Sequence, residues 1–209
     1  MTVLGSRRLY LCTPMRDDLE HFLTACIAGG VDIVQLRDKQ HDARDLIAAG
    51  RRAAAVCADL GVPFLMNDRP DLALEVGADG VHVGQDDAPV ALCRRILGPD
   101  ALVGLSTHAA GELSDACATD ATYLSAGPVV ATPTKPGRLG TGVAYAVEAT
   151  MTATVPVFVT GGVSPETIPD LAAAGVEHFV VVRALTEASD PRSAARSLRS
   201  AIDRALGEG

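Results

Sequence analysis

Short apolar runs, rich in β-branched residues, recur along the whole chain. Most of them lack the alternation of apolar and polar residues that marks a strand with one face in water. Continuous apolar runs of this length are typical of strands buried on both faces, as in a parallel sheet. The sequence therefore predicts eight strands, at Leu9–Thr13, Ile33–Leu36, Pro63–Met66, Gly80–Val83, Leu102–Leu105, Thr122–Ala126, Val155–Thr160 and Phe179–Val182.

The stretches between these runs are rich in alanine and leucine at helical spacing. The longest, Asp42–Leu60, places Leu46 and Cys57 on the same side of a helix. Ser164–Glu166 predicts a helix start, because serine caps helices and the proline that follows it favours the first helical position. Gly175 fits the matching helix end.

Strands that alternate with helices imply a parallel sheet, since each helix returns the chain to start the next strand in the same direction. Eight such units favour a closed (β/α)8 barrel, the TIM barrel, over an open doubly wound sheet. The open sheet favours a G-x-G-x-x-G turn after the first strand, and Pro14-Met15-Arg16 stands there instead. No linker or change of composition divides the chain, so we expect one α/β domain over residues 1–209.

Bulk composition narrows the classes of function. The chain has 209 residues, of which 48% are hydrophobic, and its net charge is −8. A negative protein does not suit general binding to nucleic acid or to an anionic membrane surface, because both need positive charge. Five scattered cysteines without a C-x-x-C pair indicate reduced thiols. No apolar stretch is long enough to span a membrane, so we expect a soluble cytoplasmic protein.

Polar residues follow most of the predicted strands, at the point where each strand ends. In a parallel barrel these carboxyl ends meet at one rim, where barrel enzymes carry their active sites. The sequence therefore predicts one shared pocket, built from Gln35, Arg37 and Lys39; Asn67, Asp68 and Arg69; His82, Gln85, Asp86 and Asp87; Ser106, Thr107 and His108; Thr132, Thr134 and Lys135; Gly161, Gly162 and Ser164; and Arg183.

Lysine is rare in this chain and occurs only at two of these strand ends. Lys39 and Lys135 are the two lysines, and the remaining sixteen of the 18 Lys and Arg residues are arginine. A lysine ammonium is a point charge on a flexible stem that suits phosphate oxygens. The alternative is chance in an arginine-rich composition.

The chemistry of the predicted pocket suits two anionic groups. Its positive charges and hydroxyls come from Arg37, Lys39, Lys135, Ser106, Thr132 and Thr134. Gly161-Gly162, just before the predicted helix start, lets backbone N–H groups approach an anion, and phosphate sites in barrels often use this region. The alternative for the two glycines is a tight turn without a ligand.

Asp68 and Asp87 add carboxylate oxygens at two neighbouring strand ends. Proteins usually hold Mg2+ beside phosphates through one or two carboxylates, with waters completing the shell, so this pair predicts a Mg2+ site. The alternatives are a turn cap for Asp68 and a helix cap before Pro89 for Asp87. The histidines and cysteines show no spacing typical of zinc ligands.

No Ser/His/Asp set, nucleophile elbow or carboxylate pair with a raised pKa is evident in the sequence. A pocket of cations, Mg2+ and hydroxyls without a general base suits the departure of a pyrophosphate. In such a reaction the protein mainly stabilises the leaving charge and positions the reactants.

Taken in order, these residues resemble the thiamine-phosphate synthase family. The matching segments span nearly the whole chain: QLRDK (Gln35–Lys39), ND (Asn67-Asp68), GVHVGQDD (Gly80–Asp87), GLSTH (Gly104–His108), GPVVATPTKPG (Gly127–Gly137) and VTGGVSPE (Val159–Glu166). The resemblance implies a (β/α)8 barrel that joins 4-amino-2-methyl-5-(diphosphooxymethyl)pyrimidine to 4-methyl-5-(2-phosphooxyethyl)thiazole, or to a carboxylated form of that thiazole phosphate. The implied products are thiamine phosphate and pyrophosphate, and Mg2+ is required.

The resemblance also implies roles for individual residues. The pyrimidine diphosphate would be held by Gln35, Leu36, Arg37, Asp38, Lys39 and Asn67. Mg2+ would be bound by Asp68 and Asp87. The diphosphate would be contacted by Ser106 and Lys135, which with Arg37 and Lys39 form the implied catalytic set. The thiazole phosphate would be held by Thr132, Pro133, Thr134, Gly162, Val182 and Arg183. Many relatives have serine where Arg183 stands, which leaves open whether it contacts phosphate by side chain or backbone.

The mechanism implied by the resemblance is dissociative: pyrophosphate leaves first, and the thiazole nitrogen captures a pyrimidine carbocation without a general base. Two alternatives stay open. A related thiazole tautomerase would have a histidine at Pro128 and would lack part of the Mg2+ and diphosphate set. A non-catalytic phosphate-binding barrel would gain little from holding Mg2+. The presence of Arg37, Lys39, Asp68 and Asp87 favours the synthase, acting on small molecules and compatible with a homo-oligomer.

Overall fold

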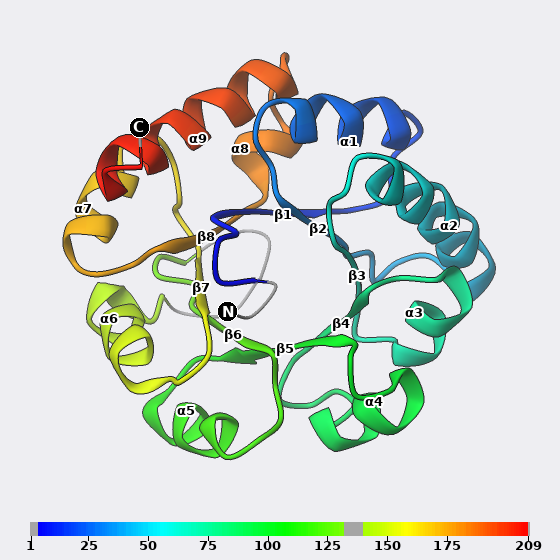
Figure 1. Ribbon diagram of the computed structural model, residues 1–209, viewed down its shortest axis with the longest axis horizontal. Helices are drawn as coiled ribbons and strands as arrows, with labels where there is room; N and C mark the ends of the chain where they lie inside the picture. The colour runs from blue at the N-terminus through cyan, green and yellow to red at the C-terminus, as the bar shows by residue number, and fades with distance from the viewer. Residues whose placement is uncertain (1–3, 132–139, 209) are drawn as a thin grey trace.

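Eight parallel strands close into a barrel in the computed structural model, which describes residues 4–131 and 140–208. Each strand pairs with its neighbour in sequence, and β1 pairs with β8 to close the ring (Figure 1). This topology confirms the predicted TIM barrel and excludes the open sheet. The strands are β1 (Leu9–Thr13), β2 (Ile33–Leu36), β3 (Phe64–Asn67), β4 (Gly80–Val83), β5 (Leu102–Thr107), β6 (Tyr123–Ala126), β7 (Val157–Thr160) and β8 (His178–Val181).

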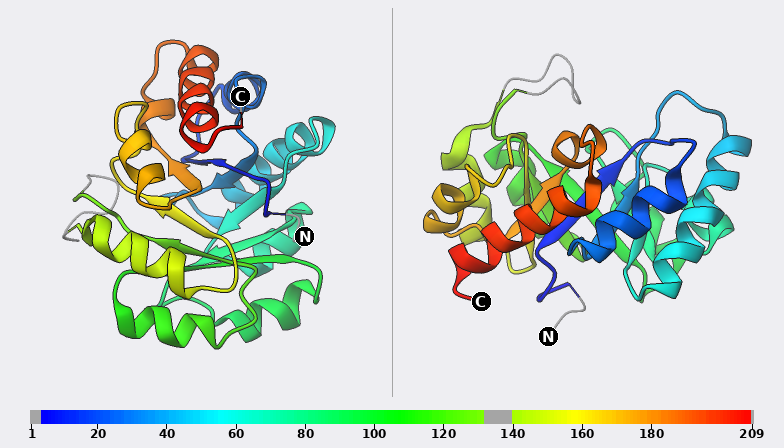
Figure 2. Two further views of the ribbon diagram at one scale, coloured as in Figure 1. Left: turned by 60° about the vertical axis from the view of Figure 1, so that its left-hand side comes forward. Right: turned by 90° about the horizontal axis from the view of Figure 1, so that it is seen from above.

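Helices cover the outside of the barrel and follow each strand along the chain (Figures 1 and 2). The longest begins where the Asp42–Leu60 pattern predicts, and the Asp42 carboxylate accepts a hydrogen bond from the Asp45 N–H at its first turn. The described helices are α1 (Leu19–Ala28), α2 (Ala43–Asp59), α3 (Pro70–Val76), α4 (Val90–Leu97), α5 (Ala110–Cys117), α6 (Gly142–Thr152), α7 (Ile168–Ala173), α8 (Arg183–Thr186) and α9 (Pro191–Leu206).

The helix start predicted at Ser164 is wrong, because α7 begins only at Ile168. The Ser164 hydroxyl donates to the Glu166 carboxylate at 2.6 Å instead of capping a helix, and the Ser164 N–H donates to the Thr167 hydroxyl at 2.9 Å. The Ser164 carbonyl accepts from the Thr167 and Ile168 N–H groups at 3.1 and 3.0 Å, so these residues form a turn that leads into α7. The predicted end is right, since Gly175 adopts a φ of 95° shortly after the last helical residue.

Two strand boundaries differ from the sequence prediction in a way that bears on function. β3 extends through Asn67 and β5 extends through Ser106 to Thr107, so these polar residues belong to strands and are buried. The predicted strands end earlier than the observed ones because polar residues normally mark a loop. Val182 lies outside β8, at the residue before α8.

The core has two layers because strand residues alternate between the inside and the outside of the barrel. The outer layer packs the strands against the helices, as at Leu11, Val81 and Phe179. The inner layer fills the barrel, and its largest members are Tyr10, Tyr123 and Phe158. Packing of this inner layer makes the barrel a solid scaffold for the rim.

Two aspartates just before strands fix neighbouring strands at the amino end of the barrel. The Asp32 carboxylate accepts hydrogen bonds from the N–H groups of Arg8 and Leu9 at 2.8 and 2.9 Å, and from Arg199. The Asp79 carboxylate accepts one from the Phe64 N–H at 2.8 Å. These bonds satisfy backbone groups that the barrel itself leaves unpaired, and so they fix the register of strand entry.

His178, at the start of β8, gives the fold a predicted pH dependence. Its ring packs on Phe158, and its Nδ1 donates to the Arg7 carbonyl at 2.6 Å. Burial lowers the pKa of His178, so the unfolded chain takes up the proton more readily than the folded one. The contribution of His178 to the free energy of unfolding is therefore fully present above about pH 6.5. It falls as the pH drops below that value, by at most about 1.4 kcal/mol per pH unit.

Urea unfolding at pH 7 and pH 5 tests this dependence. We expect the wild type to lose more of its free energy of unfolding between the two pH values than His178→Phe, which keeps the ring contact and cannot be protonated. Equal losses in the two proteins would contradict the assignment to His178.

The burial of the cysteines matches the prediction that most of them pack in the core. Four of the five are buried, and Cys117 is exposed. Burial raises the pKa of Cys26 and of Cys57 to about 12, which keeps both thiols protonated and unreactive. Across residues 4–131 and 140–208, no helix has both the length and the apolar character needed to cross a bilayer.

Candidate active site

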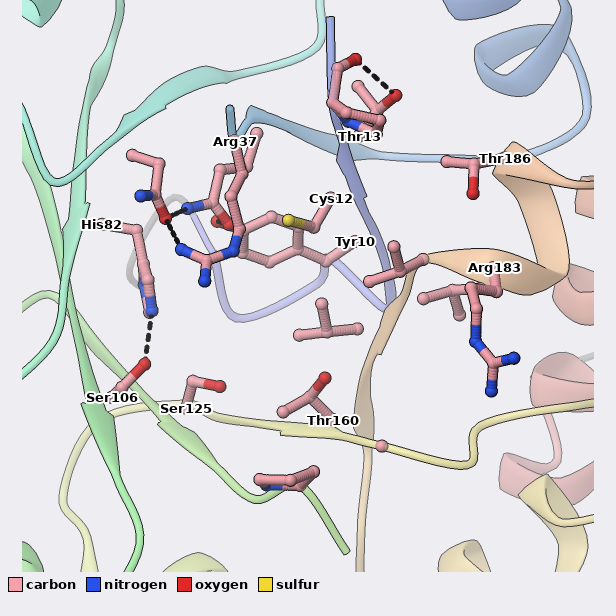
Figure 3. Close-up of a pocket in the computed structure, with 18 of the residues that line it drawn as sticks. Tyr10, Cys12, Thr13, Arg37, His82, Ser106, Ser125, Thr160, Arg183 and Thr186 are labelled. Carbon is pink, nitrogen blue, oxygen red and sulfur yellow. Dashed lines mark hydrogen bonds between the residues drawn. The ribbon is translucent and has the colours of Figure 1, made fainter. Parts of the chain in front are cut away.

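A cavity of about 1230 Å3 opens at the carboxyl ends of the strands. Residues from all eight strands or from the loops after them line it, so the barrel brings together residues from most of the chain. Figure 3 shows Arg37, His82 and Ser106 on one side of the cavity and Arg183 on the other. The volume suits more than one small polar ligand, and its position is that of the active site in barrel enzymes.

An ion pair joins the loops after β2 and β3 at the cavity rim. Lys39 Nζ lies 2.7 Å from Asp68 Oδ2, and both residues line the cavity with Arg37. The Lys39 side chain is 56% exposed, so it can leave this pair at low cost for another anion.

Asp68 is held in an unusual backbone conformation beside a second carboxylate. Its φ is 60°, the one positive value among the described residues other than glycine, and its N–H donates to the His82 carbonyl at 2.8 Å. Burial, followed by the neighbouring Asp87 carboxylate, raises the pKa of Asp68. Asp68 and Asp87 are the two residues that the sequence predicts as Mg2+ ligands, and the raised pKa of Asp68 follows from its burial and from their meeting in the folded barrel.

The two carboxylates fit a Mg2+ ion. Asp87 is fixed by the Gly84 N–H, which donates to its Oδ2 at 2.9 Å, and Asp68 is fixed by its backbone. A cation lowers the repulsion between two carboxylates held together in a partly buried site, and the Lys39 ammonium is such a cation here. Residues 4–131 and 140–208 contain no group of three or more His, Cys, Asp or Glu side chains suited to a metal. A pair of carboxylates with open coordination positions suits Mg2+ beside phosphate and does not suit zinc.

Arg37 and two amides form one hydrogen-bonded unit at the cavity wall. Arg37 Nη1 donates to Asn67 Oδ1 at 2.9 Å, and Gln35 Nε2 donates to the same oxygen at 2.8 Å. Gln35 and Asn67 are both buried. Their orientation is therefore set by the guanidinium, which can only donate.

Two buried tyrosines continue this unit across the barrel interior. Tyr10 lies between Gln35 and Tyr123, and the Tyr123 hydroxyl lies 2.9 Å from His82 Nδ1. His82 Nε2 lies 2.9 Å from Ser106 Oγ, and His82 lines the cavity as predicted (Figure 3). Neither tyrosine is among the residues predicted for the pocket, although each stands at an inward position of a predicted strand.

Four predicted residues face elsewhere or have other partners. Leu36 packs its side chain in the outer core layer, away from the cavity. Asp38 lines the cavity, but its carboxylate accepts from the Gln40 N–H and His41 and so braces its own loop. Arg69 pairs with Asp71, and Thr107 donates to the Ser125 carbonyl. Neighbours in a strand alternate in direction, so a contiguous motif cannot place all its side chains in one pocket.

Gly161 and Gly162 line the far side of the cavity, where Arg183 and Val182 also lie. Both glycines have positive φ, and a Cβ on either would lie 2.5 Å from Pro128 or 2.6 Å from Val130. These contacts support the tight-turn interpretation and leave backbone facing the cavity. The first helical residue of α7 is Ile168, six residues after Gly162. Thr132, Pro133, Thr134 and Lys135 lie outside the described residues.

Comparison with known proteins agrees with this geometry. The family model described as "Thiamine monophosphate synthase" matches residues 9–185. The chain belongs to this family. It is 44% identical over 216 residues to the thiamine-phosphate synthase of Mycobacterium tuberculosis, covering 97% of each chain. It is 48% identical over 202 residues to that of Thermobifida fusca, covering 94% of this chain and 92% of the relative.

A solved structure has the same architecture as this member of the thiamine monophosphate synthase family. The thiamine phosphate pyrophosphorylase from Pyrococcus furiosus matches with a TM-score of 0.86 at 27% identity, over 96% of this chain and 97% of that one. Membership identifies the protein as an enzyme of the transferase class and argues against a non-catalytic phosphate-binding barrel.

Proposed function

We propose that this protein is a Mg2+-dependent thiamine-phosphate synthase. It condenses 4-amino-2-methyl-5-(diphosphooxymethyl)pyrimidine with 4-methyl-5-(2-phosphooxyethyl)thiazole, or its carboxylated form, and releases pyrophosphate, together with CO2 when the carboxylated form reacts. The observation that carries the proposal is the convergence of Arg37, Lys39, Asp68 and Asp87 on one rim of one cavity. Family membership supports the same reaction.

The pyrimidine diphosphate is proposed to bind on the β2–β3 side. The amides of Gln35 and Asn67 face the pyrimidine, while Arg37 and Lys39 take the diphosphate. Lys39 exchanges its partner Asp68 for phosphate oxygens, which its exposed position allows. Leu36 contributes through its backbone, and Asp38 acts by holding the loop that carries both cations.

The thiazole phosphate is proposed to bind on the opposite side, against the backbone of Gly162 and Val182 and beside Arg183. Thr132, Pro133 and Thr134 complete this subsite in the proposal. Ser106 and Lys135 contact the diphosphate between the two sides. Arg183 is exposed in the described structure, so a phosphate can reach its guanidinium as well as its N–H.

Catalysis in this proposal is dissociative and rests on charge stabilisation. Arg37, Lys39 and Lys135 stabilise the negative charge that grows on the leaving diphosphate, and the cavity wall holds the thiazole nitrogen in line. Mg2+, held by Asp68 and Asp87, supplies further positive charge to the leaving group when bound. The thiazole nitrogen attacks with its own lone pair, so no residue has to remove a proton.

The rival isomerase is disfavoured by one position in the cavity wall. Pro128 lines the cavity where the tautomerase group is expected to have histidine. Proline has no side chain that can move a proton, so proton transfer at this point is unsupported.

The decisive experiment incubates the purified protein with both substrates and measures thiamine phosphate by chromatography. We expect product with Mg2+, loss of product with EDTA, and recovery when excess Mg2+ is restored. Absence of product in the presence of Mg2+ would overturn the assignment. Undiminished product after chelation would overturn the metal requirement and leave the synthase reaction standing.

A further inference from the structure

A continuous line of six hydrogen bonds crosses the barrel interior and joins two residues proposed to contact the diphosphate. It begins at Arg37, ends at Ser106, and each bond measures 2.8–3.1 Å between heavy atoms. All members except Arg37 are buried. In order, they are Arg37, Asn67, Gln35, Tyr10, Tyr123, His82 and Ser106.

The direction of the first bonds follows from the guanidinium. Arg37 can only donate, so the Asn67 oxygen faces it. That oxygen also faces Gln35, which must present its NH2 group and so turns its own oxygen toward Tyr10. Tyr10 therefore donates its hydroxyl proton to Gln35.

The donors in the remaining bonds follow from these assignments, because each neutral phenol has only one proton to donate. Burial raises the pKa of both tyrosines, which keeps them neutral. Tyr10 has given its proton to Gln35, so Tyr123 donates to Tyr10. The Tyr123 oxygen then accepts from His82 Nδ1–H, and the lone pair of Nε2 on a neutral His82 accepts from the Ser106 hydroxyl.

Gly104 provides a separate sign that the packing is built around this line. A Cβ at Gly104 would overlap the Tyr123 hydroxyl and lie 2.5 Å from His82 Nδ1. The glycine therefore leaves the space in which Tyr123 and His82 meet. Its φ is not in the left-handed region, so the close approach, and not the backbone conformation, calls for glycine here.

We propose that Tyr10 and Tyr123 are positioning residues that fix His82 as its Nδ1–H tautomer and turn the Ser106 proton toward His82 Nε2. Ser106 then meets a ligand with its lone pairs. This refines the proposed function, on which it rests for the identity of the ligand. A diphosphate carries few protons at neutral pH, so the contact proposed above between Ser106 and the diphosphate runs through a water that donates to both. The role of Ser106 becomes that of an acceptor that orders this water.

The test reads the tautomer of His82 in the free protein by nitrogen-15 NMR, at about pH 8.5, where an ordinary imidazole is neutral. The His82→Asn spectrum assigns the signal. We expect the wild type to show Nδ1–H. We expect Tyr123→Phe, which removes the acceptor, to exchange the two nitrogen resonances. Tyr10→Phe should do the same without touching His82, because it frees the Tyr123 proton for Nδ1.

Ser106→Ala is the matched control, since it removes the partner of Nε2 and leaves the Tyr123 side intact. It should keep the Nδ1–H signature. A wild-type His82 that carries its proton on Nε2, or a Tyr10→Phe spectrum like that of the wild type, would overturn the proposal. The readout uses no substrate, so a failure of the synthase assay and a failure of this inference are distinguishable.

Discussion

Asp68→Gly is expected to abolish the transferase activity while making the protein more stable. The carboxylate is one of the two proposed Mg2+ ligands, and losing it should lower the rate on the order of 100-fold or more. The backbone at Asp68 has a φ of 60°, a conformation that costs a residue with a Cβ about 1 kcal/mol and costs glycine little. The substitution also removes a partly buried carboxylate whose pKa is raised by burial and by Asp87.

Asp68→Ala separates the two effects, because it deletes the carboxylate and keeps a Cβ at positive φ. We expect both variants to be inactive in the chromatographic assay, and Asp68→Gly to have the higher free energy of unfolding in urea by about 1 kcal/mol. An Asp68→Gly protein that retains full activity would remove Asp68 from the metal site. Equal stability of the two variants would show that the backbone at this position carries no strain.

Gly80→Ala is expected to cost the most stability of any substitution considered. Gly80 opens β4 and pairs with Leu102 of β5. A Cβ there would overlap the carbonyl group of Leu102, and a paired backbone cannot swing away as a side chain can. We expect a loss of about 3 kcal/mol or more in the free energy of unfolding, because the β4–β5 ladder has to separate.

Gly111→Ala is the matched control for the same chemical change. Gly111 lies in α5, is exposed, and has no atom within 4 Å of an added Cβ. Alanine there should stabilise the protein by about 0.5–1 kcal/mol through helix propensity. Urea midpoints that move in opposite directions for the two variants would support this account. A Gly80→Ala protein as stable as the wild type would show that the strands can adjust.

Much of the fold could be predicted from the sequence because parallel strands are buried on both faces. Burial on both faces makes a strand a continuous apolar run, and eight such runs between helical stretches specify a closed barrel. The errors fall where local chemistry competes with the pattern. Ser164 bonds within a turn instead of capping α7, and β5 continues through the polar Ser106 because its side chain meets His82 inside the barrel.

What the sequence by itself determined was the set of strand ends and the chemical type of each residue placed there, including Arg37, Lys39 and Asp68. What only the tertiary structure decided was which of them touch. Tyr10 and Tyr123 are 113 residues apart, and their hydroxyls meet at 3.0 Å only because closure of the ring brings β1 and β6 face to face across the interior. Side-chain direction is set by strand alternation and barrel stagger, which belong to the closed sheet as a whole.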